Sequence, residues 1–455
     1  MKSNLFKKNA IYALIGFCIV FASCSTPIQH DLVISNINII DVETGKVIQN
    51  QTVAIDSNRI SEIYSKKNDF SVSTQIIDGD GKFMTPALCD NHMHISLLTS
   101  YGGDTLQNEL IEFIRKGVLY FRDVGGPVDV LQELKSKISS GKLVGPDIYF
   151  TGPMLETGPL HWEKHNEKLP GFTVSLDTRK DVDSLLPVLA EKGASMIKTF
   201  NNINAELYPY IVDVARKYNL KVVHDPGLAL LNQVPINKAL ELGVTSIEHS
   251  TPAWCYILKD KYRAEHETLL QQDSNLQQRR TFMSKMADVG IETISEDRLR
   301  ALCTLMKEKN AVYCPTLGVF NSRLLRIEEQ IANGNNDEML IKEKNIWNNF
   351  AIIGNYIVRK FSENGVKLLV GQDNIVPEGT VKEMIFMNKA GVSNIEVLRG
   401  ATLYAAEWLG LTEKYGSIKP SKRADMLILN TNPLDDIANM NDLFMVIQHG
   451  KIVNQ

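Results

Sequence analysis

Six side chains in this sequence are of types that bind metal ions or transfer protons, and each stands where a short apolar run ends. They are His92, His94, Lys198, His224, His249 and Asp373. His92 and His94 are two positions apart, so in a strand both point to the same side. Imidazole suits zinc, while imidazole with carboxylate also accepts manganese or iron. An H-x-H pair often arises by chance. The prediction of a metal site therefore depends on the other four candidate residues, which also stand at the ends of apolar runs.

Asp373 is predicted to act as the general base. A carboxylate beside a metal-bound water can take its proton and pass it to a leaving nitrogen. The metal lowers the pKa of that water toward about 7 and polarises the scissile carbonyl. Asp90 either holds a histidine by its second ring nitrogen or caps a turn.

Lys198 ends the apolar run 195–200, where a charged amine is costly to bury. Burial and neighbouring cations favour the neutral amine. A neutral amine can add carbon dioxide and become a carbamate, whose two oxygens are enough to bridge two metals. The alternative is a lysine that reaches solvent or pairs with a substrate carboxylate.

The elements that would carry these side chains alternate between strands and helices. Eight apolar runs are candidate strands: PALCDNH, GVLYFRD, DIYFTG, SMIKTF, KVVHD, VTSIEH, AVYCPTL and KLLVGQD. Helical segments such as 181–193 and 204–219 separate them, which is typical of parallel βαβ units. Eight such units predict a (β/α)₈ TIM barrel, in which chemistry occurs at the C-terminal ends of the strands. The candidate residues lie at those ends.

Short alternating strands occupy both ends of the chain, at residues 32–85 and 411–455, and flank a predicted barrel over 86–410. A charged, helix-prone excursion from Trp254 to Ser295 follows the sixth predicted strand. It is interpreted either as a lid over the active site or as solvated surface helices.

Several stretches resemble the amidohydrolase superfamily, within it the imidazolonepropionase-like branch that includes metal-dependent dipeptidases and prolidases. The stretches are TPALCDNHMH, GVLYFRDVGG, GASMIKTF, VTSIEHS, GQD and ATLYAAEWLGLTEKYGSIKPSKRADMLILNTNPLDDI. The resemblance covers about residues 32–455. It implies a barrel with a small composite β-sandwich domain formed by both chain ends.

The resemblance also implies two divalent metal ions, zinc by preference. His92 and His94 would bind one metal, His224 and His249 the other, and a carboxylated Lys198 would bridge them. Asp373 would ligate the first metal. The expected activity is cleavage of a C–N bond in a small molecule or dipeptide, as in a dipeptidase or prolidase. The alternatives are an imidazolonepropionase-like ring-opening hydrolase and a catalytically inactive binding lipoprotein.

Two departures from the family pattern concern the substrate. Pro226 follows the fifth-strand histidine where many relatives have a second histidine. The third-strand loop reads Thr157-Gly158-Pro159-Leu160-His161 in place of TGGH. His161 is expected either to reach a substrate carboxylate or to be a loop residue without a role.

The N-terminus predicts export. Three lysines precede an apolar run, and Phe21-Ala22-Ser23-Cys24 resembles a bacterial lipobox, so residues 1–24 are predicted to be a lipoprotein signal peptide. The protein would then be lipid-anchored on the periplasmic or cell-surface side, with the lipid as its one membrane contact; a plain secretory signal is the alternative. The net charge of −4 and the absence of a basic stripe predict no nucleic-acid partner.

Four cysteines follow the leader, at Cys89, Cys255, Cys303 and Cys314. No CxxC pair occurs among them, which argues against a structural zinc knuckle. Their spacing predicts no particular disulfide, and we expect most to be buried as small apolar residues.

Overall fold

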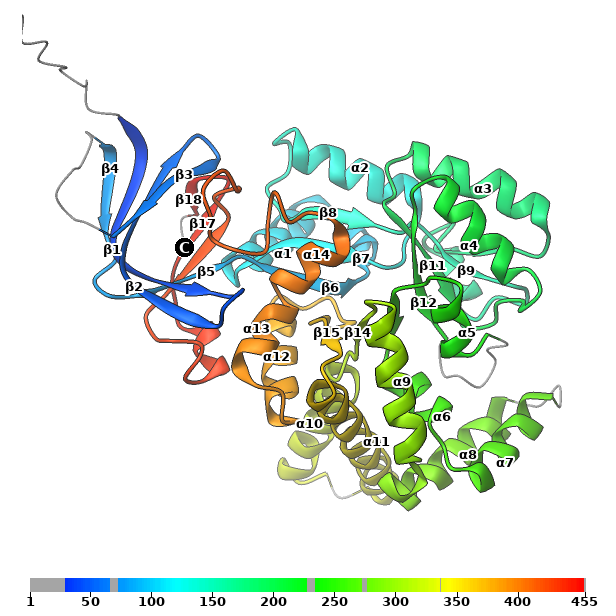
Figure 1. Cartoon of the computed structure of the whole chain (residues 1–455). Helices are drawn as coiled ribbons and strands as arrows, with labels where there is room; N and C mark the ends of the chain where they lie inside the picture. The colour runs from blue at the N-terminus through cyan, green and yellow to red at the C-terminus, as the bar shows by residue number, and fades with distance from the viewer. Residues whose placement is uncertain (1–28, 66–72, 227–233, 272–275, 336, 454–455) are drawn as a thin grey trace, which may run out of the picture.

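The computed structural model describes residues 29–453 apart from 66–72, 227–233, 272–275 and 336 (Figure 1). The predicted signal peptide therefore lies outside the described residues. Within the described part of the chain, no helix is both long and apolar enough to cross a membrane. Cys89, Cys255, Cys303 and Cys314 are all buried free thiols, as expected.

One sheet is built from both ends of the chain (Figure 1, left). Its N-terminal strands are β1 (His30–Asp41), β2 (Lys46–Asp56), β3 (Arg59–Tyr64), β4 (Ser73–Asp78) and β5 (Phe83–Pro86). Its C-terminal strands are β16 (Met426–Leu429), β17 (Leu443–Gln448) and β18 (Lys451–Val453). The two groups join where β16 runs antiparallel to β5, with Met426 opposite Pro86. A two-layered composite sandwich remains a prediction.

All eight predicted strand runs contain a strand. They are β6 (Leu88–Met93), β7 (Val118–Asp123), β8 (Asp147–Phe150), β11 (Met196–Phe200), β12 (Lys221–Asp225), β13 (Ser246–Glu248), β14 (Val312–Cys314) and β15 (Lys367–Leu368). Two short strands that the sequence did not indicate, β9 (Met154–Glu156) and β10 (Thr173–Ser175), lie between β8 and β11. Every pairing among these strands is parallel, which confirms the α/β class.

The parallel strands form two sheets, β6-β7-β8 and β10-β9-β11-β12-β13-β14-β15. Backbone hydrogen bonds cross both gaps between them. The amide of Ser195, just before β11, donates to the carbonyl of Phe150 in β8 (3.1 Å), and the amide of Asn91 in β6 donates to the carbonyl of Val370 after β15 (2.9 Å). The strands are thus neighbours at both gaps, while a fully closed barrel remains a prediction.

Helices cover the parallel strands (Figure 1). They are α1 (Gly103–Arg115), α2 (Val128–Ser139), α3 (Arg179–Glu191), α4 (Tyr208–Lys217), α5 (Ile236–Glu241), α6 (Ser250–Tyr256), α9 (Glu296–Glu308), α12 (Gly379–Lys389), α13 (Asn394–Gly400) and α14 (Leu403–Leu409). α3 shows the common pattern, because Val182, Leu186 and Leu189 recur at helical spacing and are buried. The helical segments expected at 181–193 and 204–219 are confirmed by α3 and α4.

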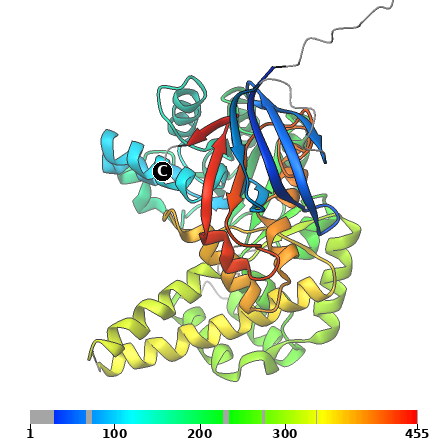
Figure 2. The ribbon, with the colours of Figure 1, turned by 90° about the vertical axis from the view of Figure 1, so that its left-hand side faces the viewer.

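Two further helix pairs lie outside the helices that cover the parallel strands. α7 (Asp260–Gln271) and α8 (Leu276–Val289) form the charged excursion after β13. α10 (Gly318–Ala332) and α11 (Glu338–Glu363) follow β14, and this yellow-green to yellow pair projects from the molecule (Figure 2). In α8 the buried side chains Phe282, Met283 and Met286 face the core, and in α11 Ile353, Ile357 and Phe361 do so.

Candidate metal centre and its cavity

His92, His94 and Asp373 converge at the C-terminal ends of β6 and β15. The Oδ1 atom of Asp373 lies 3.4 Å from Nε2 of His94 and 3.6 Å from Nε2 of His92. The backbone holds this arrangement, because the amide of Asp373 donates to the carbonyl of His92 (3.0 Å). Residues 281 positions apart in the chain are therefore held side by side.

A second group lies beside the first and consists of Lys198, Asp225 and His249. Oδ2 of Asp225 is 2.8 Å from Nζ of Lys198 and 3.1 Å from Nε2 of His249. The two groups meet at His92, whose Nε2 is 3.5 Å from Nζ of Lys198. The ring centroids of His92 and His249 are 4.7 Å apart. The structure therefore brings five of the six predicted residues together.

His224 is the sixth, and the structure places it outside this cluster. Its Nδ1 lies 3.0 Å from the hydroxyl of Tyr208 in α4 and 3.2 Å from the hydroxyl of Thr199, and its Nε2 lies 3.2 Å from the carbonyl of Val234. Burial lowers the pKa of His224 to about 4, so the ring is neutral and both nitrogens are used in these hydrogen bonds. The side chain that faces the cluster from β12 is that of Asp225.

The register between β11 and β12 explains why Asp225, and not His224, faces the cluster. Lys198 pairs with Val223, Thr199 with His224, and Phe200 with Asp225. Paired residues of adjacent strands point to the same face, and successive residues alternate. Asp225 therefore shares the face of Lys198, and His224 shares the opposite face with Thr199.

His92 is oriented by two residues that the sequence analysis did not single out, Glu248 and Arg122. Nδ1 of His92 donates to Oε2 of Glu248 (2.8 Å), and Nη2 of Arg122 donates to both oxygens of that carboxylate (2.8 Å each). Burial opposes the charge on Glu248, but Arg122 lowers its pKa to about 2. Burial lowers the pKa of His92 to about 4. The neutral ring thus carries its proton on Nδ1 and turns the Nε2 lone pair toward the cluster.

His94 and Asp90 are held differently. Nδ1 of His94 donates to the carbonyl of Gly125 (2.9 Å), which leaves its Nε2 facing Asp373. Asp90 holds no imidazole: it accepts from the backbone amide of His92 (3.0 Å), from Nε2 of Gln372 (2.9 Å) and from the hydroxyl of Thr380 (2.6 Å). Asp90 therefore ties β6 to the segment after β15.

The donor atoms fit a divalent metal. The ligand atoms of His92, His94 and Asp373 all lie within 4.8 Å of one another, and so do those of His92, Asp225 and His249. Imidazole nitrogen with carboxylate oxygen is a donor set that zinc, manganese and iron accept. His249 is part of this electrostatic network: burial works against it, but the Asp225 carboxylate raises its pKa.

The cluster opens into a cavity of about 590 Å³. His94, Lys198, Asp225, His249 and Asp373 line it, and His161 does so from the third-strand loop. The backbone amide of His161 donates to Glu156 (3.0 Å), and its ring contacts Trp162 and Phe200. A substrate in this cavity would reach both the metal ligands and His161.

The excursion from Trp254 to Ser295 does not form the cavity wall in the described part of the chain. α10 and α11 line the cavity instead, through Phe320, Arg323 and Trp347. The lid interpretation gains no support from the described residues of this stretch, and the alternative of solvated surface helices holds only in part, because Trp254, Leu258 and Met286 are buried in the core. α8 packs on α11, and the side-chain amide of Asn349 in α11 donates to the carboxylate of Asp288 in α8 (3.2 Å).

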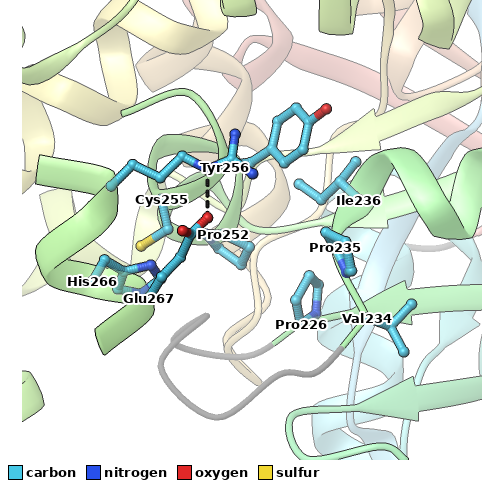
Figure 3. Close-up of a pocket in the computed structure, with 10 residues that line it drawn as sticks. Pro226, Val234, Pro235, Ile236, Pro252, Cys255, Tyr256, His266 and Glu267 are labelled. Atoms are coloured by element: carbon cyan, nitrogen blue, oxygen red, sulfur yellow. Dashed lines mark hydrogen bonds and ion pairs between the residues drawn. The ribbon is translucent and has the colours of Figure 1, made fainter. Parts of the chain in front are cut away.

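A smaller cavity of about 100 Å³ lies between α5, α6 and α7 (Figure 3). Pro226, Pro235 and Pro252 give it apolar walls. Its charged residues Arg263 and Glu267 form an ion pair (2.7 Å), so they neutralise each other. This cavity offers less chemistry than the one that contains the cluster.

Comparisons with known proteins agree with these observations. Residues 329–453 match the sequence profile of the Amidohydrolase family. Adenine deaminase from Staphylothermus marinus is 38% identical over 77 residues, which is 16% of this chain and 13% of that protein. Adenine deaminase from Listeria welshimeri is 25% identical over 242 residues, 50% of this chain and 36% of that protein. These matches span well under two thirds of the curated relatives.

Solved structures cover nearly the whole chain. A Xaa-Pro dipeptidase with bound methionine in its active site has a TM-score of 0.66 and 22% identity, over 93% of this chain and 100% of that one. The A. niger ochratoxinase has a TM-score of 0.66 and 20% identity, over 92% and 95% of the two chains. The family match over residues 329–453 agrees with the resemblance to the amidohydrolases, and the solved structures show that the fold is shared along nearly the whole chain.

Proposed function

We propose that this chain is a metal-dependent hydrolase that cleaves a C–N bond in a small amide, as a dipeptidase or prolidase does. One observation carries the proposal: imidazoles and carboxylates on or shortly after β6, β12, β13 and β15 come together beside one cavity. A barrel-type site at the C-terminal ends of strands is where such enzymes hold their chemistry.

The proposed ligands form two sets, and His92 lies next to the members of both. His92, His94 and Asp373 would hold one divalent cation, and Asp225 and His249 would hold the second. Zinc is the proposed metal because imidazole ligands predominate. Asp225 takes the place predicted for His224, because it is the β12 side chain within 3.1 Å of His249.

The chain's own groups then supply orientation and proton transfer. A divalent cation bound here would lower the pKa of water toward about 7 and polarise the scissile carbonyl. Burial opposes the charge on Asp373, but His92, His94 and His249 hold the pKa of its carboxyl well below the ordinary range. Asp373 is thus an ionised carboxylate, free to accept the proton of the attacking water and deliver it to the leaving nitrogen.

Lys198 lies beside both ligand sets, since its amine contacts His92 and Asp225, so it is the residue that would carry a carbamate ligand. Its amine forms an ion pair with Asp225 (2.8 Å). We propose that carboxylation of Lys198 accompanies metal loading. Carbon-13 NMR after incubation with labelled bicarbonate and zinc would show a carbamate signal, and Lys198→Ala would abolish it.

A substrate screen on zinc-loaded protein tests the proposed reaction. The panel should hold dipeptides with and without C-terminal proline, acyl-amino acids and cyclic amides. It should also hold adenine, because the curated relatives with matching segments are adenine deaminases. We expect turnover of a dipeptide or acyl-amino acid. Metal-loaded protein that turns over no compound in the panel would contradict the hydrolase proposal and favour a binding lipoprotein.

Asp373→Asn is the sharpest single variant. The amide keeps the shape of the side chain but cannot accept a proton, so kcat is expected to fall by about a hundredfold or more. Asp129→Asn is the matched control, since Asp129 lies on the exposed face of α2. A near-normal kcat in Asp373→Asn would exclude Asp373 as the base.

Export and lipid attachment remain part of the proposal. Cys24 lies outside the described residues, so the case rests on the sequence pattern. Labelling of whole cells with a palmitate analogue should mark the wild-type protein and not Cys24→Ser. Label in both proteins or in neither would contradict acylation at Cys24.

A further inference from the structure

The cavity that contains the candidate ligands is lined by aromatic side chains from two separate parts of the chain. Trp162 and Phe172 lie between the ends of β9 and β10, and Phe320 and Trp347 belong to α10 and α11. Trp162 remains 40% exposed. An indole exposed at a cavity is a common mark of a binding surface, because a ligand that covers it removes apolar area from water.

The α10–α11 wall is fixed and electrically neutral. The rings of Phe320 and Trp347 stack with centroids 5.9 Å apart. Oε1 of Glu343 accepts from the indole nitrogen of Trp347 (3.1 Å) and from Nε of Arg323 (2.9 Å). The guanidinium of Arg323 also lies 4.7 Å from the centroid of the Trp347 ring. The charge of Arg323 is therefore balanced by Glu343, and the wall presents an oriented indole rather than a free cation.

The wall beside β10 leads from the exposed indole to a candidate ligand. The rings of Trp162 and His165 are 4.9 Å apart, edge to face. His165 in turn stacks on Phe172, with centroids 5.3 Å apart. The Phe172 ring is 6.0 Å from the ring of His94. Aromatic surface thus runs without interruption to the metal ligands.

We propose that these two walls form a subsite for an uncharged aromatic group of the substrate, so that the enzyme acts on amides that carry an aromatic side chain or ring. This inference rests on the proposed hydrolase function for the reaction itself. Aromatic pairs favour offset or edge-to-face contacts, which both walls can offer. Arg323 is already paired with Glu343, so the α10–α11 wall favours an apolar ring over an anionic group.

Kinetics with matched substrates test the subsite. Dipeptides and acyl-amino acids should be compared in sets that differ only by alanine, phenylalanine or glutamate at one position. We expect kcat/KM at least about tenfold higher for phenylalanine than for alanine, and lowest for glutamate. Equal values for phenylalanine and alanine at every position would overturn the subsite while leaving the hydrolase proposal intact.

Variants of the two walls test which side chains produce the preference for phenylalanine over alanine. Trp162→Ala changes an exposed side chain and Trp347→Ala a half-buried one, so the pair guards against loss of folding in either. Each should lower the phenylalanine-to-alanine ratio of kcat/KM by about tenfold. The control is Phe444→Ala, an aromatic residue 40% exposed on β17, away from the cavity; it should leave the ratio unchanged. An unchanged ratio in both tryptophan variants would contradict the proposal.

A binding measurement separates the two proposals. Tryptophan fluorescence of the metal-free wild-type protein should report tighter binding of acetyl-phenylalaninamide than of acetyl-alaninamide, by about tenfold. If this preference is present but the wild type hydrolyses nothing, the subsite stands and the hydrolase proposal fails. If the two amides bind equally, the subsite fails whatever the wild type hydrolyses.

Discussion

At the scale of single residues, the composition of the site depends on which of two neighbours in β12 faces inward. Asp225 contacts Lys198 and His249, while His224 contacts Tyr208 and Thr199. A carboxylate in this position adds negative charge beside Lys198 and leaves the imidazole to a structural role. This difference can be measured, because replacing Asp225 should lower the metal content of the protein and replacing His224 should not.

Asp225→Asn and His224→Gln form a matched pair for that measurement. We expect Asp225→Asn to lose about one equivalent of zinc relative to wild type, because a neutral amide is a weaker ligand than a carboxylate. His224→Gln should keep the wild-type zinc content, although loss of its bond to Tyr208 would lower its Tm. Elemental analysis of dialysed protein gives the metal content directly. Loss of zinc in His224→Gln but not in Asp225→Asn would reverse the proposed roles.

At the scale of elements, α3 shows how a helix is positioned by its N-terminal cap and by its buried apolar side chains. α3 begins with a capping box, in which the hydroxyl of Thr178 accepts from the amide of Asp181, and the Asp181 carboxylate accepts from the amide of Thr178. Such a motif satisfies two of the amide donors that a helix N-terminus leaves without intrahelical partners. α3 in turn covers the strands near β11, which carries Lys198.

Thr178→Ala should therefore destabilise the fold without changing the site. We expect the free energy of unfolding to fall by about 1 kcal/mol, the usual effect of losing a cap. Urea denaturation followed by circular dichroism would measure it. Thr178→Ser keeps the hydroxyl and should behave like wild type; equal losses in both variants would show that the cap hydroxyl is not the cause.

At the scale of the whole molecule, Asp147 links the parallel strands to the sheet made by the chain ends. From β8 it contacts Lys414 (3.0 Å), Arg423 (2.6 Å) and the hydroxyl of Tyr415, all in the segment between α14 and β16. Burial opposes its charge, but Arg423 and Lys414 lower the pKa of Asp147 to about 2. The ionised carboxylate is thus part of what holds the two regions together.

The pH dependence of this link follows from the lowered pKa. The stabilisation is fully present above the ordinary pKa of 3.8 and is lost as pH falls toward about 2. Asp147→Asn should lower the free energy of unfolding by about 2 kcal/mol near neutral pH, and this difference should shrink between pH 4 and 2. Thermal denaturation of both proteins across this range measures it, with Asp129→Asn as a control at an exposed pair. A difference that stays constant with pH would contradict the assignment.

Much of this arrangement could be read from local patterns. Apolar runs of strand length marked all eight strands that carry or flank the candidate residues, because strand formation depends on short-range alternation and burial. The same runs indicated that His92, His94, Lys198, His249 and Asp373 would lie at one level, since parallel strands present their C-terminal ends together. The match of residues 329–453 to the Amidohydrolase family agrees with the resemblance seen in the sequence.

The tertiary structure alone decided the rest, for physical reasons. Whether His224 or Asp225 faces inward depends on the register of β12 against β11, and a shift of one residue exchanges the faces. Glu248 and Arg122 gain their role by contacts 126 positions apart, which no local pattern contains. The cavity wall is formed by α10 and α11 rather than by residues 254–295, and this depends on long-range packing that no local pattern contains. Local sequence therefore determines which residues end the strands, and long-range packing determines which of those side chains meet.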